Sequence, residues 1–217
     1  MRQSSVAALP PERSTIVTEP SLNYFFPSVV QSGTIADAEA LNRRLLPAVE
    51  AVRAARPGAK PDQWSCSLYT TMTDPESLAL LDREPFSELK PVFLREAVRF
   101  GHALSMDVDK FPPRITDFWV NVFEPGDAQD VHRHPNSIIS GIYYVQAPPE
   151  SGYLMFHSPA DDELMPPMRE RSDLNVLTSP WEPQPGQLLL FRSWLRHSVM
   201  PNRSDALRVS LSFNVCL

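Results

Sequence analysis

The sequence predicts an α+β protein in which helices come first and a β-rich unit follows. Two observations lead to this fold class. Apolar residues recur at helical spacing in the first half of the chain, and short alternating or apolar segments bounded by glycine and proline follow Pro113. This order is typical of an antiparallel sheet whose helices cover one outer face.

The length and composition limit the class of protein. The 217 residues suit one structural domain with a core of useful size. The net charge is −6 and no basic run is present, which argues against nucleic acid or a membrane as partner. No apolar run approaches the roughly 18 residues of a membrane span, and the N-terminal segment lacks the pattern of a secretion signal. Two cysteines cannot form a disulfide framework, so we expect a cytoplasmic protein, and the commonest soluble assembly would be a homodimer.

The first half of the chain is expected to support the sheet. Residues 1–20 are polar and should form a loose arm, and residues 21–112 should be mainly helical. A helix is predicted over Ile35–Arg56, with Thr34 as its N-cap, because apolar residues recur there every three or four positions. A short helix should open at Asp74-Pro75, and a longer one should span about Ser87–Ser105. The intervening segment, Trp64–Thr71, is ambiguous.

Residues 113–217 are predicted to be the β-rich unit. Its expected strands are Ile115–Glu124, Ile138–Ala147, Tyr153–Phe156, Gln187–Phe191, His197–Met200 and Leu207–Val215. The last of these alternates most clearly, with apolar residues at the odd positions and Arg208, Ser210, Ser212 and Asn214 at the even ones. The apolar face can pack under the helices, whereas the polar face meets either solvent or the inside of a cavity.

The histidines of the β-rich unit are the first candidates for chemistry. His132 and His134 are two residues apart, so in an extended segment both imidazoles project to the same side. Imidazole is the commonest metal-binding side chain, and a third histidine from a later strand could help to enclose one ion. A His-x-His pair alone is equally typical of two surface histidines. Three further side chains could line a pocket near this segment or near the sheet: Asn121, Gln129 and Tyr144.

The ordered set of residues after Pro113 resembles the iron(II)- and 2-oxoglutarate-dependent oxygenases, and most closely a bacterial and phage group of this superfamily. His132 matches the first histidine of the family, and His197, sixty-five residues later, matches its distal histidine. Arg208 matches the cation that holds the distal carboxylate of 2-oxoglutarate, and Ser210 completes an Arg-x-Ser pair. The resemblance implies a double-stranded β-helix, or jelly roll, that uses Fe(II), 2-oxoglutarate and O2.

The sequence departs from the usual pattern at the third metal ligand. The common site has two histidines and one carboxylate, but His134 stands at the carboxylate position. Three interpretations stay open. All three histidines could bind iron; His132 and His197 could bind it with water or with a carboxylate such as Asp130 or Asp161; or His134 could be the first ligand, with Asn136 in the third position.

The resemblance predicts an oxygenase that hydroxylates an aliphatic C–H bond of a small molecule or peptidyl side chain and releases succinate and CO2. One alternative is a cupin-type metal dioxygenase that uses no 2-oxoglutarate. Gly126, six positions before His132, mimics the start of a cupin motif, but the expected glutamate is missing and Arg208 has no role there. The other alternative is a jelly-roll binding module without catalytic activity.

Overall fold

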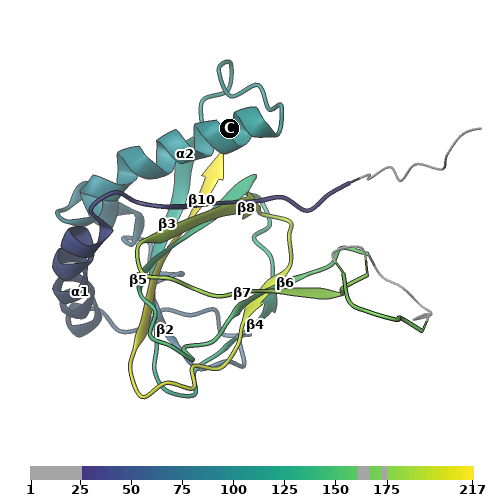
Figure 1. Cartoon of the computed structure of the whole chain (residues 1–217). Helices are drawn as coiled ribbons and strands as arrows, with labels where there is room; N and C mark the ends of the chain where they lie inside the picture. The colour runs from purple at the N-terminus through teal and green to yellow at the C-terminus, as the bar shows by residue number, and fades with distance from the viewer. Residues whose placement is uncertain (1–25, 161–166, 173–174) are drawn as a thin grey trace, which may run out of the picture.

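Two facing antiparallel sheets and two long helices make up the described part of the chain (Figure 1). The computed structural model describes residues 26–160, 167–172 and 175–217, so the arm predicted over residues 1–20 lies outside it. Helices before a largely β second half confirm the α+β class.

The larger sheet has six strands in the order β1-β8-β5-β10-β3-β2, and the smaller has four in the order β4-β9-β6-β7. Every pair of neighbouring strands is antiparallel. The strands of the larger sheet are β1 (Val30–Thr34), β2 (Tyr69–Thr70), β3 (Arg114–Phe123), β5 (Ile139–Gln146), β8 (Gln187–Arg192) and β10 (Arg208–Cys216). Those of the smaller sheet are β4 (Gln129–His132), β6 (Leu154–His157), β7 (Thr178–Trp181) and β9 (His197–Val199).

The helices differ from the prediction mainly at their starts. They are α1 (Ala38–Ala55) and α2 (Leu89–Ala103), with short 3-10 turns η1 (Leu78–Asp82) and η2 (Phe86–Glu88) before α2. The N-cap of α1 is Asp37, which has a left-handed backbone with φ 53°, so the prediction of Thr34 was wrong. The reason is tertiary: Thr34 is the last residue of β1 and pairs with Gln187 of β8.

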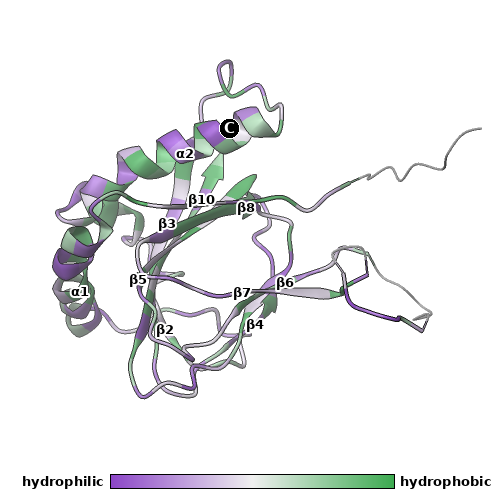
Figure 2. Ribbon diagram, in the orientation of Figure 1, coloured by the Kyte–Doolittle hydropathy of each residue, from purple (hydrophilic) through white to green (hydrophobic). Residues whose placement is uncertain are grey.

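The main core lies between the helices and the outer face of the six-stranded sheet. Phe93 of α2 stacks on Phe213 of β10, with ring centroids 4.0 Å apart and an interplanar angle of 11°. Leu45 and Val49 of α1 are fully buried in the same cluster. Figure 2 shows hydrophobic residues along β8 and a mixture of hydrophilic and hydrophobic residues along both helices, as amphipathic covering helices require. The helices therefore occupy one face of the sheet and leave the other free to face the smaller sheet.

Candidate metal and co-substrate site

The polar face of β10 points into the space between the two sheets. Arg208, Ser210, Ser212 and Asn214 are 1%, 3%, 4% and 6% exposed, so this face meets a cavity rather than solvent. The cavity is lined by residues of both sheets: Trp119, Asn121, Phe123, Gln129, His132, His134, Ile142, Leu154, His197, Val199, Arg208, Ser210 and Ser212. Three of the five histidines of the chain thus share one interior with the buried arginine.

The three histidines come from adjacent strands of the smaller sheet and from the loop beside them. His132 ends β4 and is paired in register with His197, which opens β9. His134 lies just beyond β4, where its backbone N–H donates to the carbonyl of Ser193. One ring nitrogen from each histidine lies within 4.8 Å of the other two. This spacing is short enough for one metal ion to contact all three imidazoles.

The hydrogen bonds of the three imidazoles fix which nitrogen faces the cavity. The Nδ1–H of His132 donates to the Asp130 carbonyl at 2.8 Å, and that of His197 donates to the Leu195 carbonyl at 2.9 Å. The Nδ1–H of His134 donates to Oδ1 of Asn214 at 2.7 Å. Because carbonyl oxygens only accept, the proton is on Nδ1 in each ring, and each Nε2 keeps a free lone pair.

Burial keeps all three histidines neutral at ordinary pH. It lowers the pKa of His132, and it lowers the pKa of His134 to about 4 with help from the neighbouring His132. The pKa of His197 is held well below its usual value by burial and then by the two other imidazoles. Neutral imidazole is the form that binds a metal ion.

A cation suits this group of atoms better than any partner the described residues offer. Nε2 of His134 is buried and has no hydrogen-bond partner there, while Nε2 of His132 accepts only the side-chain amide of Gln129 at 3.2 Å. No carboxylate among the described residues joins the three histidines. The carboxylate of Asp130 instead accepts the hydroxyl of Ser65 at 2.5 Å, and Asn136 is not among the residues that line the cavity. The third carboxylate or amide candidate, Asp161, lies outside the described residues.

Arg208 is a buried cation at the other end of the polar face. Its Nη1–H donates to the carbonyls of Gly152 at 2.6 Å and Ser151 at 3.4 Å. The rings of Phe123 and Tyr144 each lie with their centroid 5.3 Å from the guanidinium carbon. Nε has no partner, and no described carboxylate forms an ion pair with this side chain. Burial lowers the pKa of Arg208, but a guanidinium stays charged, so an anionic group would suit this position.

The other predicted pocket residues take different places. Asn121 lines the cavity, with its Nδ2–H donating to Ser212 at 3.1 Å and its Oδ1 without a partner. Ser210 and Gln129 also line it, whereas Tyr144 is fully buried beside Arg208, with its ring centroid 5.3 Å from the guanidinium carbon. Ser210 pairs in register with both Asn121 and Tyr144, which explains why these residues gather.

Tryptophans near the site come from separate parts of the chain. Trp119 is buried and lines the cavity, with its ring 5.4 Å from that of His134. Trp194, between β8 and β9, is 41% exposed. Trp64, which the sequence did not single out, lies 5.6 Å from His132 between ring centroids. Its contact joins a loop before β2 to β4, so no local pattern could indicate it.

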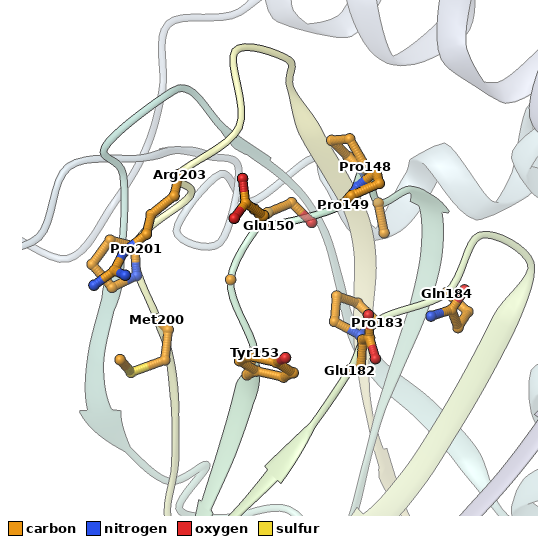
Figure 3. Close-up of a pocket in the computed structure, with 13 residues that line it drawn as sticks. Pro148, Pro149, Glu150, Tyr153, Glu182, Pro183, Gln184, Met200, Pro201 and Arg203 are labelled. Carbon is orange, nitrogen blue, oxygen red and sulfur yellow. The ribbon is translucent and has the colours of Figure 1, made fainter.

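A second, larger cavity of about 620 Å³ lies among the loops that carry Pro148, Pro183 and Pro201 (Figure 3). Tyr153 and Met200 line it together with four prolines and with Glu150, Glu182 and Arg203, and no histidine is among its lining residues. Ser151 and Gly152, whose carbonyls accept from Arg208, also line it. The larger cavity is thus separate from the three histidines.

Solved structures with the same fold include a non-heme alpha ketoglutarate dependent epimerase and a prolyl-4-hydroxylase. SnoN, the non-heme alpha ketoglutarate dependent epimerase from nogalamycin biosynthesis, aligns with a TM-score of 0.60 and 12% identity over 87% of this chain and 76% of its own. A Pseudomonas putida prolyl-4-hydroxylase aligns with a TM-score of 0.59 and 15% identity over 87% and 92%. At these identities the likeness shows the fold, and it confirms the predicted jelly roll.

The family model identifies the chain more closely. Residues 117–214 match the model of the family described as "Putative 2OG-Fe(II) oxygenase". The protein is therefore an iron(II)- and 2-oxoglutarate-dependent oxygenase, as the sequence predicted, and Fe(II), 2-oxoglutarate and O2 are the metal and co-substrates of its class. SnoN is also known in complex with Fe3+ and alpha ketoglutarate. No curated protein matches the sequence, and within the described residues no helix is long and apolar enough to cross a membrane.

Proposed function

We propose that this oxygenase hydroxylates an aliphatic C–H bond of a small molecule or a peptidyl side chain. His132, His134 and His197 would hold the iron, and Arg208 with Ser210 would hold the distal carboxylate of 2-oxoglutarate. One observation carries the proposal: nitrogens of three imidazoles lie within 4.8 Å of one another in the same cavity as a buried arginine that lacks a described carboxylate partner. A metal ion would complete the three imidazoles, and a carboxylate of the co-substrate would pair with Arg208.

The residues would divide the work between metal and co-substrate. Bound Fe(II) supplies the oxidation, in which O2 and 2-oxoglutarate are converted to succinate and CO2 while one oxygen atom enters the substrate C–H bond. Three neutral histidines leave the ion's positive charge uncompensated, one unit more than a site with a carboxylate ligand. That extra charge favours the dianionic 2-oxoglutarate.

Arg208 is built to grip one end of the co-substrate. A guanidinium binds a carboxylate through two parallel N–H donors, and the Ser210 hydroxyl, two residues along the same strand face, adds another donor. The Gly152 carbonyl and the two flanking rings hold the guanidinium in place before the ligand arrives. The unpartnered Oδ1 of Asn121 faces the same interior and offers an acceptor to a bound hydroxyl or water.

Arg208 also favours this function over the cupin-type alternative. A dioxygenase without 2-oxoglutarate would need the three histidines but no buried cation, and burying an unpaired charge costs several kcal/mol. The presence of the three histidines and Arg208 in one cavity supports a dianionic co-substrate that reaches from the metal to the arginine.

Anaerobic titration with Fe(II) and 2-oxoglutarate tests the proposal. The visible absorption band of an iron(II)–2-oxoglutarate chelate should appear only when both are present, and His132→Ala and His197→Ala should each abolish it. The band should persist, at higher co-substrate concentration, in Arg208→Ala. Tight Fe(II) binding with no band at saturating 2-oxoglutarate would favour the cupin-type alternative, and the absence of metal binding would favour a module without catalytic activity.

A further inference from the structure

The three histidines are not held alike. His132 and His197 donate their Nδ1–H to backbone carbonyls, which secondary structure fixes. His134 donates only to side chains, with Nδ1 2.7 Å from Oδ1 of Asn214 and 2.8 Å from Oγ of Ser140. Its tautomer therefore depends on residues that substitution can change without altering the backbone.

The orientation of Asn214 follows from its other neighbour. Nδ2 of Asn214 donates to a carboxylate oxygen of Asp117 at 3.3 Å, and an ionised carboxylate can only accept. The amide nitrogen must therefore face Asp117, so Oδ1 faces His134. The reverse orientation would set the amide oxygen against the carboxylate and an N–H against the protonated Nδ1.

The hydroxyl of Ser140 agrees with this orientation. It donates its one proton to Oδ1 of Asn214 at 2.8 Å, which leaves its oxygen to accept from His134 and from the hydroxyl of Ser193 at 2.9 Å. With Asn214 Oδ1 accepting only, the proton of His134 must be on Nδ1. The lone pair on Nε2, which has no partner, then lies in the cavity.

We propose that Asn214, oriented by Asp117, is a positioning residue that selects the Nδ1–H tautomer of His134 and so allows a histidine to serve where related sites use a carboxylate. This rests on the proposed function, in which His134 holds the metal. Strand register brings these side chains together, because Asn214 of β10 is opposite Asp117 of β3 and Ser140 of β5.

The position of Asn214 makes a purely structural role a poor explanation. The same amide could have been satisfied by backbone groups, yet its oxygen accepts from both the His134 imidazole and the Ser140 hydroxyl, directly behind a histidine that lines the cavity. Its carboxylate neighbour adds a negative charge behind the imidazole, which raises the basicity of the nitrogen that would face the metal.

The test measures the tautomer and the metal affinity separately. In the metal-free protein, ¹⁵N NMR of the imidazoles, with the His134 signals assigned by their loss in His134→Ala, should show the proton on Nδ1. In Asn214→Leu this preference should be lost, and the dissociation constant for Co(II) alone, measured by calorimetry, should rise about 10- to 100-fold.

Asn42→Leu is the matched control. Asn42 is 7% exposed, like Asn214 at 6%, and its Oδ1 accepts from a buried side-chain donor, the Tyr143 hydroxyl, at 2.7 Å. It lies on α1 against the helix-covered face, so the same substitution should cost stability there but leave the His134 tautomer and Co(II) affinity unchanged.

A second variant covers the case in which Asn214→Leu does not fold. Asn214→Asp combined with Asp117→Asn keeps the size of both side chains and restores an acceptor for His134, so its Co(II) affinity should match or exceed the parent's. A tenfold or greater loss in this folded pair, or an unchanged tautomer and affinity in folded Asn214→Leu, would overturn the proposal. If His132→Ala and His197→Ala also bind Co(II) normally, the metal site itself is wrong, which distinguishes that failure from a failure of Asn214 alone.

Discussion

The two faces of β10 are equally buried and chemically opposite. On the outer face, Val209, Leu211, Phe213 and Val215 are at most 1% exposed and pack in the core under the helices. On the inner face, Arg208, Ser210, Ser212 and Asn214 are at most 6% exposed and line or adjoin the cavity. Burial alone therefore does not distinguish structural from functional residues in this strand.

What distinguishes the two faces of β10 is whether their buried polar atoms have hydrogen-bond partners. The outer face holds apolar groups whose contacts are complete, as in the stacked pair of Phe93 and Phe213. In and beside the cavity, Nε of Arg208, Nε2 of His134 and Oδ1 of Asn121 have no partner among the described residues. Unpaired buried polar groups each cost about 1–3 kcal/mol, so we infer that the inner face gives up stability in order to bind ligands.

The largest expected effect comes from removing a proposed metal ligand on the inner side. His197→Ala should lose activity by far more than the 10- to 100-fold typical of an outer partner, because it removes one of the three imidazoles proposed to hold the iron. Succinate release in the presence of Fe(II) and 2-oxoglutarate measures this. The metal-free variant should still unfold cooperatively, and near-normal turnover by a folded variant would show that His197 is not a ligand.

Among substitutions on the outer face, Phe213→Ala should have the largest effect. It should lower folding stability and leave ligand binding largely unchanged. Removing a fully buried phenylalanine from a packed core costs about 3–5 kcal/mol, here with loss of the stack on Phe93. Urea unfolding of the metal-free protein measures the cost. Below the unfolding transition, the affinity for 2-oxoglutarate should stay within a few-fold of the parent's, and a large loss there would show that the two faces are coupled.

The features of the two faces of β10 that depend on local sequence could be predicted. The two-residue period of β10 is visible in the chain itself, and so are the His132–His134 spacing and the later Arg208. The outer face of β10 does lie under the helices, and the alternative of a solvent-exposed polar face was wrong, because β4 and β9 close the other side.

Features set by distant pairing could not be predicted. The partners of His134 come from β10 and β5, and their approach depends on a strand register that no single segment encodes. Strand β1 contains glycine, a residue that is depleted in strands, and β1 forms because it pairs with β8. The same pairing moved the start of α1 from Ile35 to Ala38.

Arg208→Met should show separately what Arg208 costs in folding stability and what it contributes to 2-oxoglutarate binding. The affinity for 2-oxoglutarate should fall about a hundredfold, or roughly 2.7 kcal/mol, since a buried charge-assisted pair is lost. The metal-free variant should be as stable as the parent or more stable, because an apolar side chain of similar length replaces an unpaired buried cation.

Calorimetry with 2-oxoglutarate and thermal unfolding without it measure the two effects of Arg208→Met. Co(II) affinity without co-substrate should not change, because the arginine is not a ligand, and Arg208→Lys should recover only part of the 2-oxoglutarate affinity. Normal 2-oxoglutarate binding in Arg208→Met would place the co-substrate elsewhere.

The smallest expected effect comes from adding one methyl group to the outer face of β5. Gly141 is paired with Phe213, and a Cβ atom built there would lie 2.2 Å from Cζ of the ring. The ring cannot withdraw freely because Phe93 stacks on it at 4.0 Å, so Gly141→Ala should cost about 1–3 kcal/mol through overpacking. Phe213→Leu in the same chain removes the obstructing ring atoms, so the double variant should be more stable than the sum of the two single losses predicts, by at least 0.5 kcal/mol on the usual scale of coupled neighbours. Denaturant unfolding of the four proteins measures this coupling. Since Gly141 and Phe213 both face the helices, 2-oxoglutarate affinity should be the same in all four, and additive losses would mean that the ring and the new methyl group never meet.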